Sequence, residues 1–320
     1  MKKKYSTAEV IEFVIFLALL VIAFARLFYR LGAAGLNATD EAWYAVDTCE
    51  MLKSGNWIVP THQYHIDIGS KPPFGLWLIM LTYKVFGYSA FSLRFYSAVS
   101  GFLTILGIAG YLYKRFGAKY AVFATAVFST LDTCFNYHMF RAGDMDALFS
   151  LIFVVTLYSL IRLSEGEEKM MILYGVCISL GFGVKSLHVA LLIFILALYF
   201  PFVYKHIRAK YVAIAALITV IPNAIWMVLR YQVDGWAFLY KVTLGELDDK
   251  TSDFITLGFV RSMAQEKVTW IMLAVLFIRA IIYFAPTRKE LSWSKFRSDF
   301  LSMCKKRYIS IIAYLAPIVM

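Results

Sequence analysis

Residues 10–29 read VIEFVIFLALLVIAFARLFY, and residues 36–52 follow with LNATDEAWYAVDTCEML. The first stretch is long and apolar enough to cross a bilayer as one helix, because about 20 apolar residues span the hydrocarbon core. A lysine run at positions 2–4 precedes it and favours a cytoplasmic N-terminus. The acidic pair Asp40 and Glu41 is therefore expected just beyond the outer membrane surface, where an ionised group needs a functional reason.

The composition is that of a membrane protein. Hydrophobic residues make up 61% of the 320 residues and charged residues 17%, whereas soluble domains average about 45–50% and about 25%. Further apolar segments have the length and composition of spans: 91–113, 120–137, 144–163, 170–184, 187–204, 211–229 and 268–286. We therefore predict an all-α fold, a polytopic transmembrane helical bundle of about eight spans.

The net charge of +11 follows the membrane topology. Alternate threading of the spans places the basic segments on the same side as the N-terminus: 114–119, 162–169, 205–210 and 287–307. Lys and Arg concentrate in cytoplasmic connections, so this excess sets orientation. The charge therefore excludes nucleic acid as a partner and predicts a multi-pass membrane protein, which we expect in a bacterial cell membrane.

We expect a single transmembrane domain over residues 1–320, with a catalytic outer loop at about 30–90 and a second outer loop at 230–267. The chain ends inside a short apolar run, 308–320, so its C-terminal end looks truncated.

Two interfacial helices are predicted in the first outer loop. The segment 41–54 has apolar residues at helical spacing: Ala42, Ala45, Val46, Cys49 and Leu52. Residues 74–87 are apolar but too short to span. Cys49 and Cys134 are expected to be unpaired, since the four cysteines show no framework spacing.

Several motifs lie in a recognisable order along the chain: Asp40-Glu41 with Tyr44-Ala45, Lys71-Pro72-Pro73 with Trp77, Arg94, and Arg141-Ala-Gly-Asp144-Met-Asp146. Later segments, LGFGVKSLHVALL at 180–192 and RYQVDGWAFLYKVTLGELDDK at 230–250, continue the pattern. Over about residues 10–286 the chain resembles the GT-C superfamily, in the branch of protein O-mannosyltransferases and lipid A aminoarabinose transferases (glycosyltransferase families 39 and 83). The resemblance implies transfer of a sugar from a polyprenyl phosphate to a lipid, protein or glycan hydroxyl on the outer face.

Such a transfer needs a base for the acceptor hydroxyl. Asp40 is the first carboxylate beyond the membrane, and the family's catalytic aspartate falls on it; the alternative is a helix cap for 41–54. Glu41 either helps to bind the acceptor or decorates the first turn. The resemblance gives Asp146 a role in shaping the site, with an ion pair to Arg141 as the structural alternative. Asp144 is expected to be hydrated and ranks below Asp146.

The departing phosphate needs cations. Lys71 precedes the Pro72-Pro73 pair, which holds the backbone rigidly extended. Lys185 lies between two apolar segments, where apolar packing gives no reason for a lysine. The resemblance places Arg94 at the lipid phosphate, and Arg141 completes the set. Two or three of these four cations are expected to touch the phosphate; an alternative for Lys71 is snorkelling near headgroups.

His62 and His65 form an H-x-x-H pair that raises a metal interpretation. No helix fixes their geometry, and Ser70 stands where some relatives have an acid before Lys-Pro-Pro. The sequence therefore leaves the cofactor open and does not support a metal site.

The sequence as a whole predicts a polyprenyl-phosphate-sugar-dependent glycosyltransferase. Two alternatives remain: a transporter or flippase of lipid-linked sugar, and a truncated relative that binds lipid without catalysis. The charges expected to be functional lie on one side of the membrane, which favours one-sided chemistry.

Overall fold

A computed structural model of the chain describes residues 6–36, 40–63, 65–66, 71–135 and 139–241, which belong to one compact unit, Met1–Gly245. Its α-helices are α1 (Thr7–Phe28), α2 (Asp40–Ser54), α3 (Pro73–Phe86), α4 (Ala90–Phe116), α5 (Ala118–Thr130), α6 (Asp146–Ser164), α7 (Met170–Lys185), α8 (Val189–Val203), α9 (Ala209–Asp234) and α10 (Trp236–Tyr240). Short 3-10 turns are η1 (Asp132–Cys134), η2 (Ser186–His188) and η3 (Tyr204–His206), and a hairpin joins β1 (Thr61–His62) to β2 (His65–Ile66).

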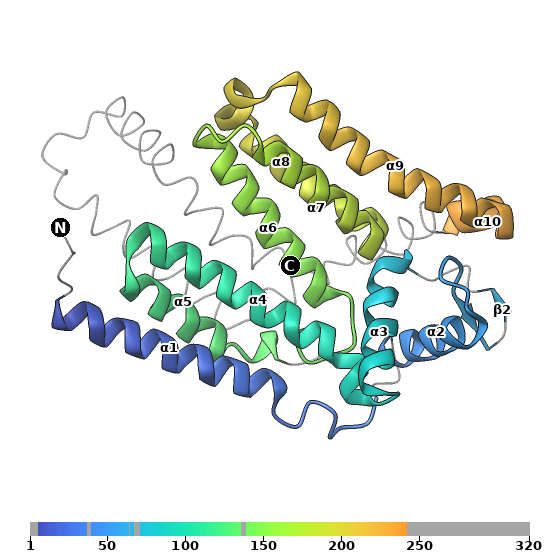
Figure 1. Cartoon of the computed structure of the whole chain (residues 1–320), viewed down its shortest axis with the longest axis horizontal. Coiled ribbons are helices and arrows are strands. Elements are labelled where there is room, and N and C mark those ends of the chain that lie inside the picture. Colours follow the sequence, from blue (N-terminus) through green and yellow to red (C-terminus); the bar gives the residue numbers. More distant parts are fainter. Residues whose placement is uncertain (1–5, 37–39, 64, 67–70, 136–138, 242–320) are drawn as a thin grey trace, which may run out of the picture. The chain divides into compact units, whose positions relative to one another are not determined.

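Long apolar helices dominate the described part. Five segments in it are long and apolar enough to span a membrane: Thr7–Phe28, Ala90–Phe116, Asp146–Ser164, Met170–His206 and Ala209–Asp234. The predicted all-α polytopic bundle is thus confirmed, and the short helices α2 and α3 occupy the predicted first outer loop (Figure 1). The span predicted at 268–286 lies outside the described residues.

One predicted span needs correction. The helix expected over 120–137 is α5, which has 13 residues and ends at Thr130; at about 1.5 Å per residue it is too short to span alone. It stops where the chain turns into η1, whose Asp132 pairs with Arg26 of α1 (Nη2 to Oδ1, 2.6 Å).

The chain doubles back between α7 and α8. Gly181 of α7 packs against Leu192 of α8, since a Cβ added to Gly181 would lie 2.8 Å from Leu192 Cδ1. In one straight helix, 11 residues would separate the two positions by about 16 Å. The turn is η2, where Ser186 has a positive φ of 37°.

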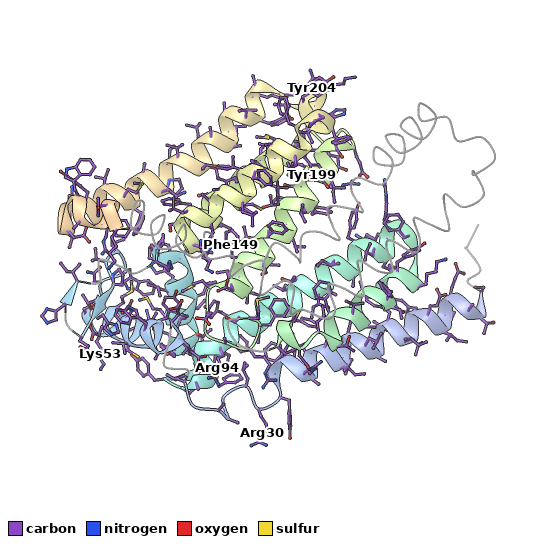
Figure 2. All side chains as sticks on the ribbon, turned by 180° about the vertical axis from the view of Figure 1, so that it is seen from behind. Arg30, Lys53, Arg94, Phe149, Tyr199 and Tyr204 are labelled. Atoms are coloured by element: carbon purple, nitrogen blue, oxygen red, sulfur yellow. The ribbon has the colours of Figure 1, made fainter. Side chains whose placement is uncertain are left out.

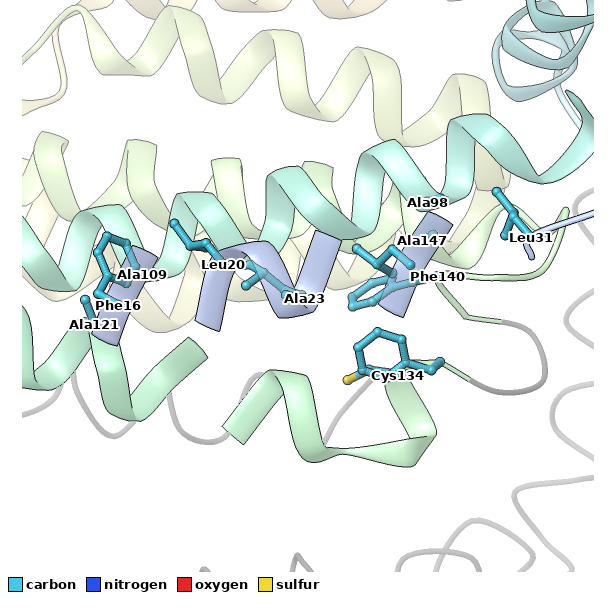
Figure 3. Close-up of a cluster of buried hydrophobic side chains, with 13 residues drawn as sticks. Phe16, Leu20, Ala23, Leu31, Ala98, Ala109, Ala121, Cys134, Phe140 and Ala147 are labelled. Carbon is cyan, nitrogen blue, oxygen red and sulfur yellow. The ribbon is translucent and has the colours of Figure 1, made fainter. Parts of the chain in front are cut away.

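Helices α1, α4 and α5 pack side by side around a buried apolar cluster (Figures 1 and 3). Small residues line much of this contact: Ala23, Ala98, Ala109, Ala121 and Ala147. Small side chains allow membrane helices to approach closely, which favours packing where lipid competes with every apolar contact.

Helices α7 and α9 form a second close contact. Gly175 packs directly against Ala215. A Cβ added to Gly175 would lie only 2.6 Å from the Cβ of Ala215, so no larger residue fits there. Thr219 Oγ1 donates to the Gly175 carbonyl at 3.0 Å, and Asn223 Nδ2 donates to Ser179 Oγ at 3.1 Å. Polar side chains of this kind join helices where water is absent.

Helix α2 turns a largely polar face toward the protein. Its buried residues are Glu41, Tyr44, Asp47, Thr48 and Met51, whereas the five apolar residues of the predicted amphipathic pattern stay partly or fully exposed. The helix predicted at 41–54 is present, and the sequence did not indicate which of its faces is buried. The bundle thus receives two carboxylates from one helix.

The first outer loop is fastened to the bundle by tryptophans. Trp77 Nε1 on α3 donates to the Trp57 carbonyl at 2.7 Å, and Trp226 Nε1 on α9 donates to the Ile58 carbonyl at 3.2 Å. Cys49 is a free cysteine, as predicted.

Candidate active site

A buried ion pair joins α2 to α4. Arg94 Nε donates to Glu41 Oε1 at 2.6 Å, and Arg94 Nη2 donates to Oε2 at 2.8 Å. Glu41 is completely buried and Arg94 is 5% exposed. In Figure 2, Arg94 lies near α2, at one end of the helix bundle, and Tyr204 lies near the opposite end.

The remaining donors of Arg94 are also engaged. They bond to three backbone carbonyls between α1 and α2, those of Leu31 (3.0 Å), Ala34 (3.1 Å) and Gly35 (2.7 Å). A guanidinium has five N–H donors, and here all five bond to the protein. The geometry therefore does not support the direct phosphate contact predicted for Arg94.

Glu41 also reaches the segment that precedes α6. Its Oε1 accepts a hydrogen bond from the Gly143 backbone N–H at 2.8 Å. One carboxylate thus links three segments: the start of α2, α4 and the loop at Gly143. Glu41 is placed to hold the site together, and its predicted catalytic role has no exposed oxygen to support it.

The segment after Gly143 carries two acids that differ in exposure. Asp144, expected to be hydrated, is 2% exposed, and its backbone carbonyl accepts from Ser97 Oγ at 3.1 Å. The Asp146 side chain is 38% exposed at the first turn of α6.

Lys185 is the partner of Asp146, with 2.6 Å between Nζ and Oδ1. The lysine ends α7, and 39 residues of sequence separate the two. The alternative ion pair between Asp146 and Arg141 is absent among the described contacts. Arg141 instead donates to two carbonyls at the end of α1, those of Arg26 and Tyr29, a common way to satisfy the last carbonyls of a helix.

Lys71 stands immediately before the start of α3, where Pro72 and Pro73 begin the helix as predicted. Gly75, in the first turn, lies against the sulfur of Met145, which precedes Asp146. A Cβ on Gly183 of α7 would lie 3.2 Å from Phe74 Cβ. The start of α3 therefore meets the start of α6 and the end of α7, which brings Lys71 to the same part of the protein as the Lys185–Asp146 pair.

Asp40 opens α2 and is exposed, whereas its neighbour Glu41 is buried. Tyr44 follows one turn later and is 4% exposed. Burial raises the pKa of the Tyr44 phenol well above its ordinary value, and the nearby charge of Asp40 raises it further. The carboxylates of Asp144 and Asp146 act on the same phenol more weakly, so α2 and the start of α6 face each other here.

Sequence reasoning did not find a second polar cluster on α2. The imidazole Nδ1 of His62 lies 2.9 Å from Oδ1 of Asp47, which is completely buried, and the ring stacks on Trp43 with centroids 3.8 Å apart. An ionised Asp47 carboxylate only accepts, so with that charge state the His62 Nδ1–H is the donor in this contact. The spacing of Glu41, Tyr44 and Asp47 would have been the sequence signal, had the polar stripe been assigned to the protein side.

The H-x-x-H pair forms the hairpin itself, with His62 and His65 as cross-strand partners. In the described ranges, no group of three or more His, Cys, Asp and Glu side chains is placed to hold a metal ion.

The site thus offers an exposed carboxylate at the start of α2, a lysine–carboxylate pair, and a further lysine at the start of α3. Ionised carboxylates accept protons, and lysines bind phosphate oxygens as point charges. The arrangement suits proton removal beside a phosphate leaving group.

Known proteins resemble this chain in sequence and in fold. Residues 70–226 match the family described as dolichyl-phosphate-mannose-protein mannosyltransferase. An undecaprenyl phosphate-α-4-amino-4-deoxy-L-arabinose arabinosyl transferase from Pseudomonas savastanoi is 34% identical over 176 residues, which are 53% of this chain and 32% of that protein. A protein of the same name from Pseudomonas fluorescens is 30% identical over 239 residues, covering 70% of this chain and 40% of that protein.

Solved structures show the same fold. The crystal structure of ArnT from Cupriavidus metallidurans bound to undecaprenyl phosphate aligns with a TM-score of 0.58 and 18% identity, covering 72% of this chain and 44% of ArnT. Its apo structure aligns with a TM-score of 0.54. The fold and the site define a polytopic membrane protein of the GT-C superfamily. Within that superfamily, the chain is of the protein O-mannosyltransferase and lipid A aminoarabinose transferase type. It spans about a third of the length of the Pseudomonas savastanoi relative.

Proposed function

We propose that this protein transfers a sugar from a polyprenyl phosphate to a hydroxyl of a lipid, protein or glycan at the outer face of the membrane. The observation that carries the proposal is the contrast between adjacent carboxylates on α2. Glu41 is locked by Arg94 and Gly143, so the exposed Asp40 is presented on a rigid helix start. A carboxylate held in this way suits a general base.

In the proposed reaction, Asp40 accepts the proton of the acceptor hydroxyl as its oxygen attacks the anomeric carbon. The new bond joins the acceptor oxygen to that carbon, and the bond from the carbon to the phosphate oxygen breaks. Its electron pair leaves with the polyprenyl phosphate. The family match and the names of the relatives support a donor of this kind.

Lys71 and Lys185 are the proposed phosphate ligands, since both reach the meeting point of α3, α6 and α7. Asp146 contacts Lys185 and keeps its ammonium in place. Arg94 and Glu41 act as positioning residues, a revision of the roles predicted from the sequence. A phosphate role for Arg141 stays a prediction, because its described contacts are to the end of α1.

The test is product analysis with the full chain in membranes. Undecaprenyl phosphate carrying labelled 4-amino-4-deoxy-L-arabinose or mannose is supplied, and the label is followed. The proposal expects label to move to an acceptor and undecaprenyl phosphate to appear. Label that crosses the membrane still attached to the lipid would indicate a flippase instead.

A further inference from the structure

Tyr44 is a buried tyrosine whose hydroxyl forms no hydrogen bond with the described residues. It lies on the inward face of α2, four residues after Asp40, so the two side chains are neighbours on the helix surface. Its side chain is 4% exposed. Across the described residues, no hydrogen bond involves its hydroxyl, and the hydroxyl oxygen is not among the fully buried polar atoms, so a ligand can reach it.

The surroundings of this hydroxyl are acidic. Glu41, one turn earlier, bonds to the backbone of Gly143, which fixes α2 against the segment that carries Asp144 and Asp146. Burial, followed by the charge of Asp40, raises the pKa of Tyr44 well above the ordinary value of 10.0. The phenol therefore stays protonated at physiological pH and can donate a hydrogen bond.

The chemistry of the ligand follows from what these groups offer. Ionised carboxylates only accept hydrogen bonds, and a phenol among them supplies a neutral donor. A sugar can donate from its hydroxyls to the carboxylates and accept from the phenol at its oxygens, whereas the phosphate offers only acceptor oxygens and suits the lysines. A polyhydroxylated ring complements this combination better than an anion does.

We infer that Tyr44 is a sugar-binding residue whose hydroxyl donates to an oxygen of the sugar carried by the donor lipid. The sugar's own hydroxyls donate to the neighbouring carboxylates. The inference rests on the proposed function, since it assigns a subsite to the same donor. It separates recognition of the sugar, by α2, from recognition of the phosphate, by Lys71 and Lys185.

Tyr44→Phe tests the inference, because it removes the hydroxyl and keeps the ring. Tyr96→Phe is a matched control: the Tyr96 hydroxyl donates to the Gly143 carbonyl at 3.0 Å and so has a structural partner. Purified full chains in detergent are titrated with undecaprenyl phosphate, and with the same lipid carrying mannose or 4-amino-4-deoxy-L-arabinose. Melting temperatures are recorded for each variant.

We expect the wild type to bind at least one sugar-bearing lipid more tightly than the bare lipid. Tyr44→Phe should weaken binding of that lipid about tenfold, the scale of one hydrogen bond in a charged site. Its affinity for bare undecaprenyl phosphate and its melting temperature should not change. Tyr96→Phe should lower the melting temperature, because it leaves a buried carbonyl without its donor.

Three results would overturn the inference: equal affinity of wild type and Tyr44→Phe for the sugar-bearing lipid, no preference of the wild type for either sugar-bearing lipid, or a fall in melting temperature as large as that of Tyr96→Phe. None of these requires the wild type to lose its binding of the bare lipid. A wild-type protein that binds no undecaprenyl phosphate would instead contradict the proposed function itself.

Discussion

Arg94 and Glu41 are 53 residues apart in sequence and form two hydrogen bonds of 2.6 and 2.8 Å in the protein interior. The pair determines where α2 begins relative to α4, and Gly143 adds the loop before α6 to the same carboxylate. The buried Glu41, which substrate cannot reach, therefore fixes the position of the exposed Asp40.

Glu41→Gln should destabilise the protein. The change leaves the Arg94 guanidinium buried with a neutral partner, and breaking a buried pair typically costs about 3–5 kcal/mol. A fall of about 6 °C or more in the melting temperature in detergent is expected. Asp40→Asn, at the adjacent exposed position, is the control and should melt near the wild type. A Glu41→Gln variant as stable as that control would refute the positioning role.

The Lys185–Asp146 pair should behave as one unit in transfer. We expect Lys185→Met and Asp146→Asn each to lower the transfer rate, and the double variant to lose less than the product of the two effects. Groups in direct contact are non-additive in this way. The rates of the four proteins form the measurement. Strictly multiplicative losses would mean that the two side chains act separately.

The raised pKa of Tyr44 predicts a pH dependence of stability. A phenol whose folded-state pKa is raised contributes stability that is present below the unfolded value of 10.0 and is lost as pH rises through the folded value. Melting temperatures above pH 10 should thus fall more steeply in the wild type than in Tyr44→Phe. Parallel curves would show that ionisation of Tyr44 is not linked to folding.

His62 should fasten the β1–β2 hairpin to α2. His62→Phe retains a ring that stacks on Trp43 but removes the donor to the buried Asp47 carboxylate. We expect faster hydrogen exchange and proteolysis in the hairpin, with α4 unaffected. His65→Phe, at the exposed cross-strand position, should change little. Equal protection in both variants would deny His62 this role.

Local signals in the sequence predicted much of the fold. The apolar run of α1 and the proline pair at the start of α3 predicted these elements within a few residues. The partners of residues far apart in the sequence could not be predicted. The contacts of Arg94 and Lys185 depend on residues 53 and 39 positions away, and no pattern in one sequence reports them.

The orientation of α2 could not be predicted from the sequence. Its amphipathic pattern predicted an interfacial helix but did not indicate which residues face the protein. At a membrane the surroundings of the protein are partly apolar, so a polar stripe can face the protein. Asp47 lies on that stripe and is buried. Asp144 was expected in water because nothing local revealed the packing of Gly143 against Glu41.

Asp40 is the central residue of the proposed function, because it is the proposed base. Asn caps a helix as well as Asp does, so Asp40→Asn removes the negative charge with little effect on folding. The decisive measurement is single-turnover transfer from a labelled undecaprenyl-phosphate sugar, together with binding of the bare lipid, for wild type and Asp40→Asn. We predict unchanged lipid binding and transfer reduced by about 10²-fold or more. Transfer at the wild-type rate in Asp40→Asn would contradict the account and leave Asp40 as a residue of the first helical turn.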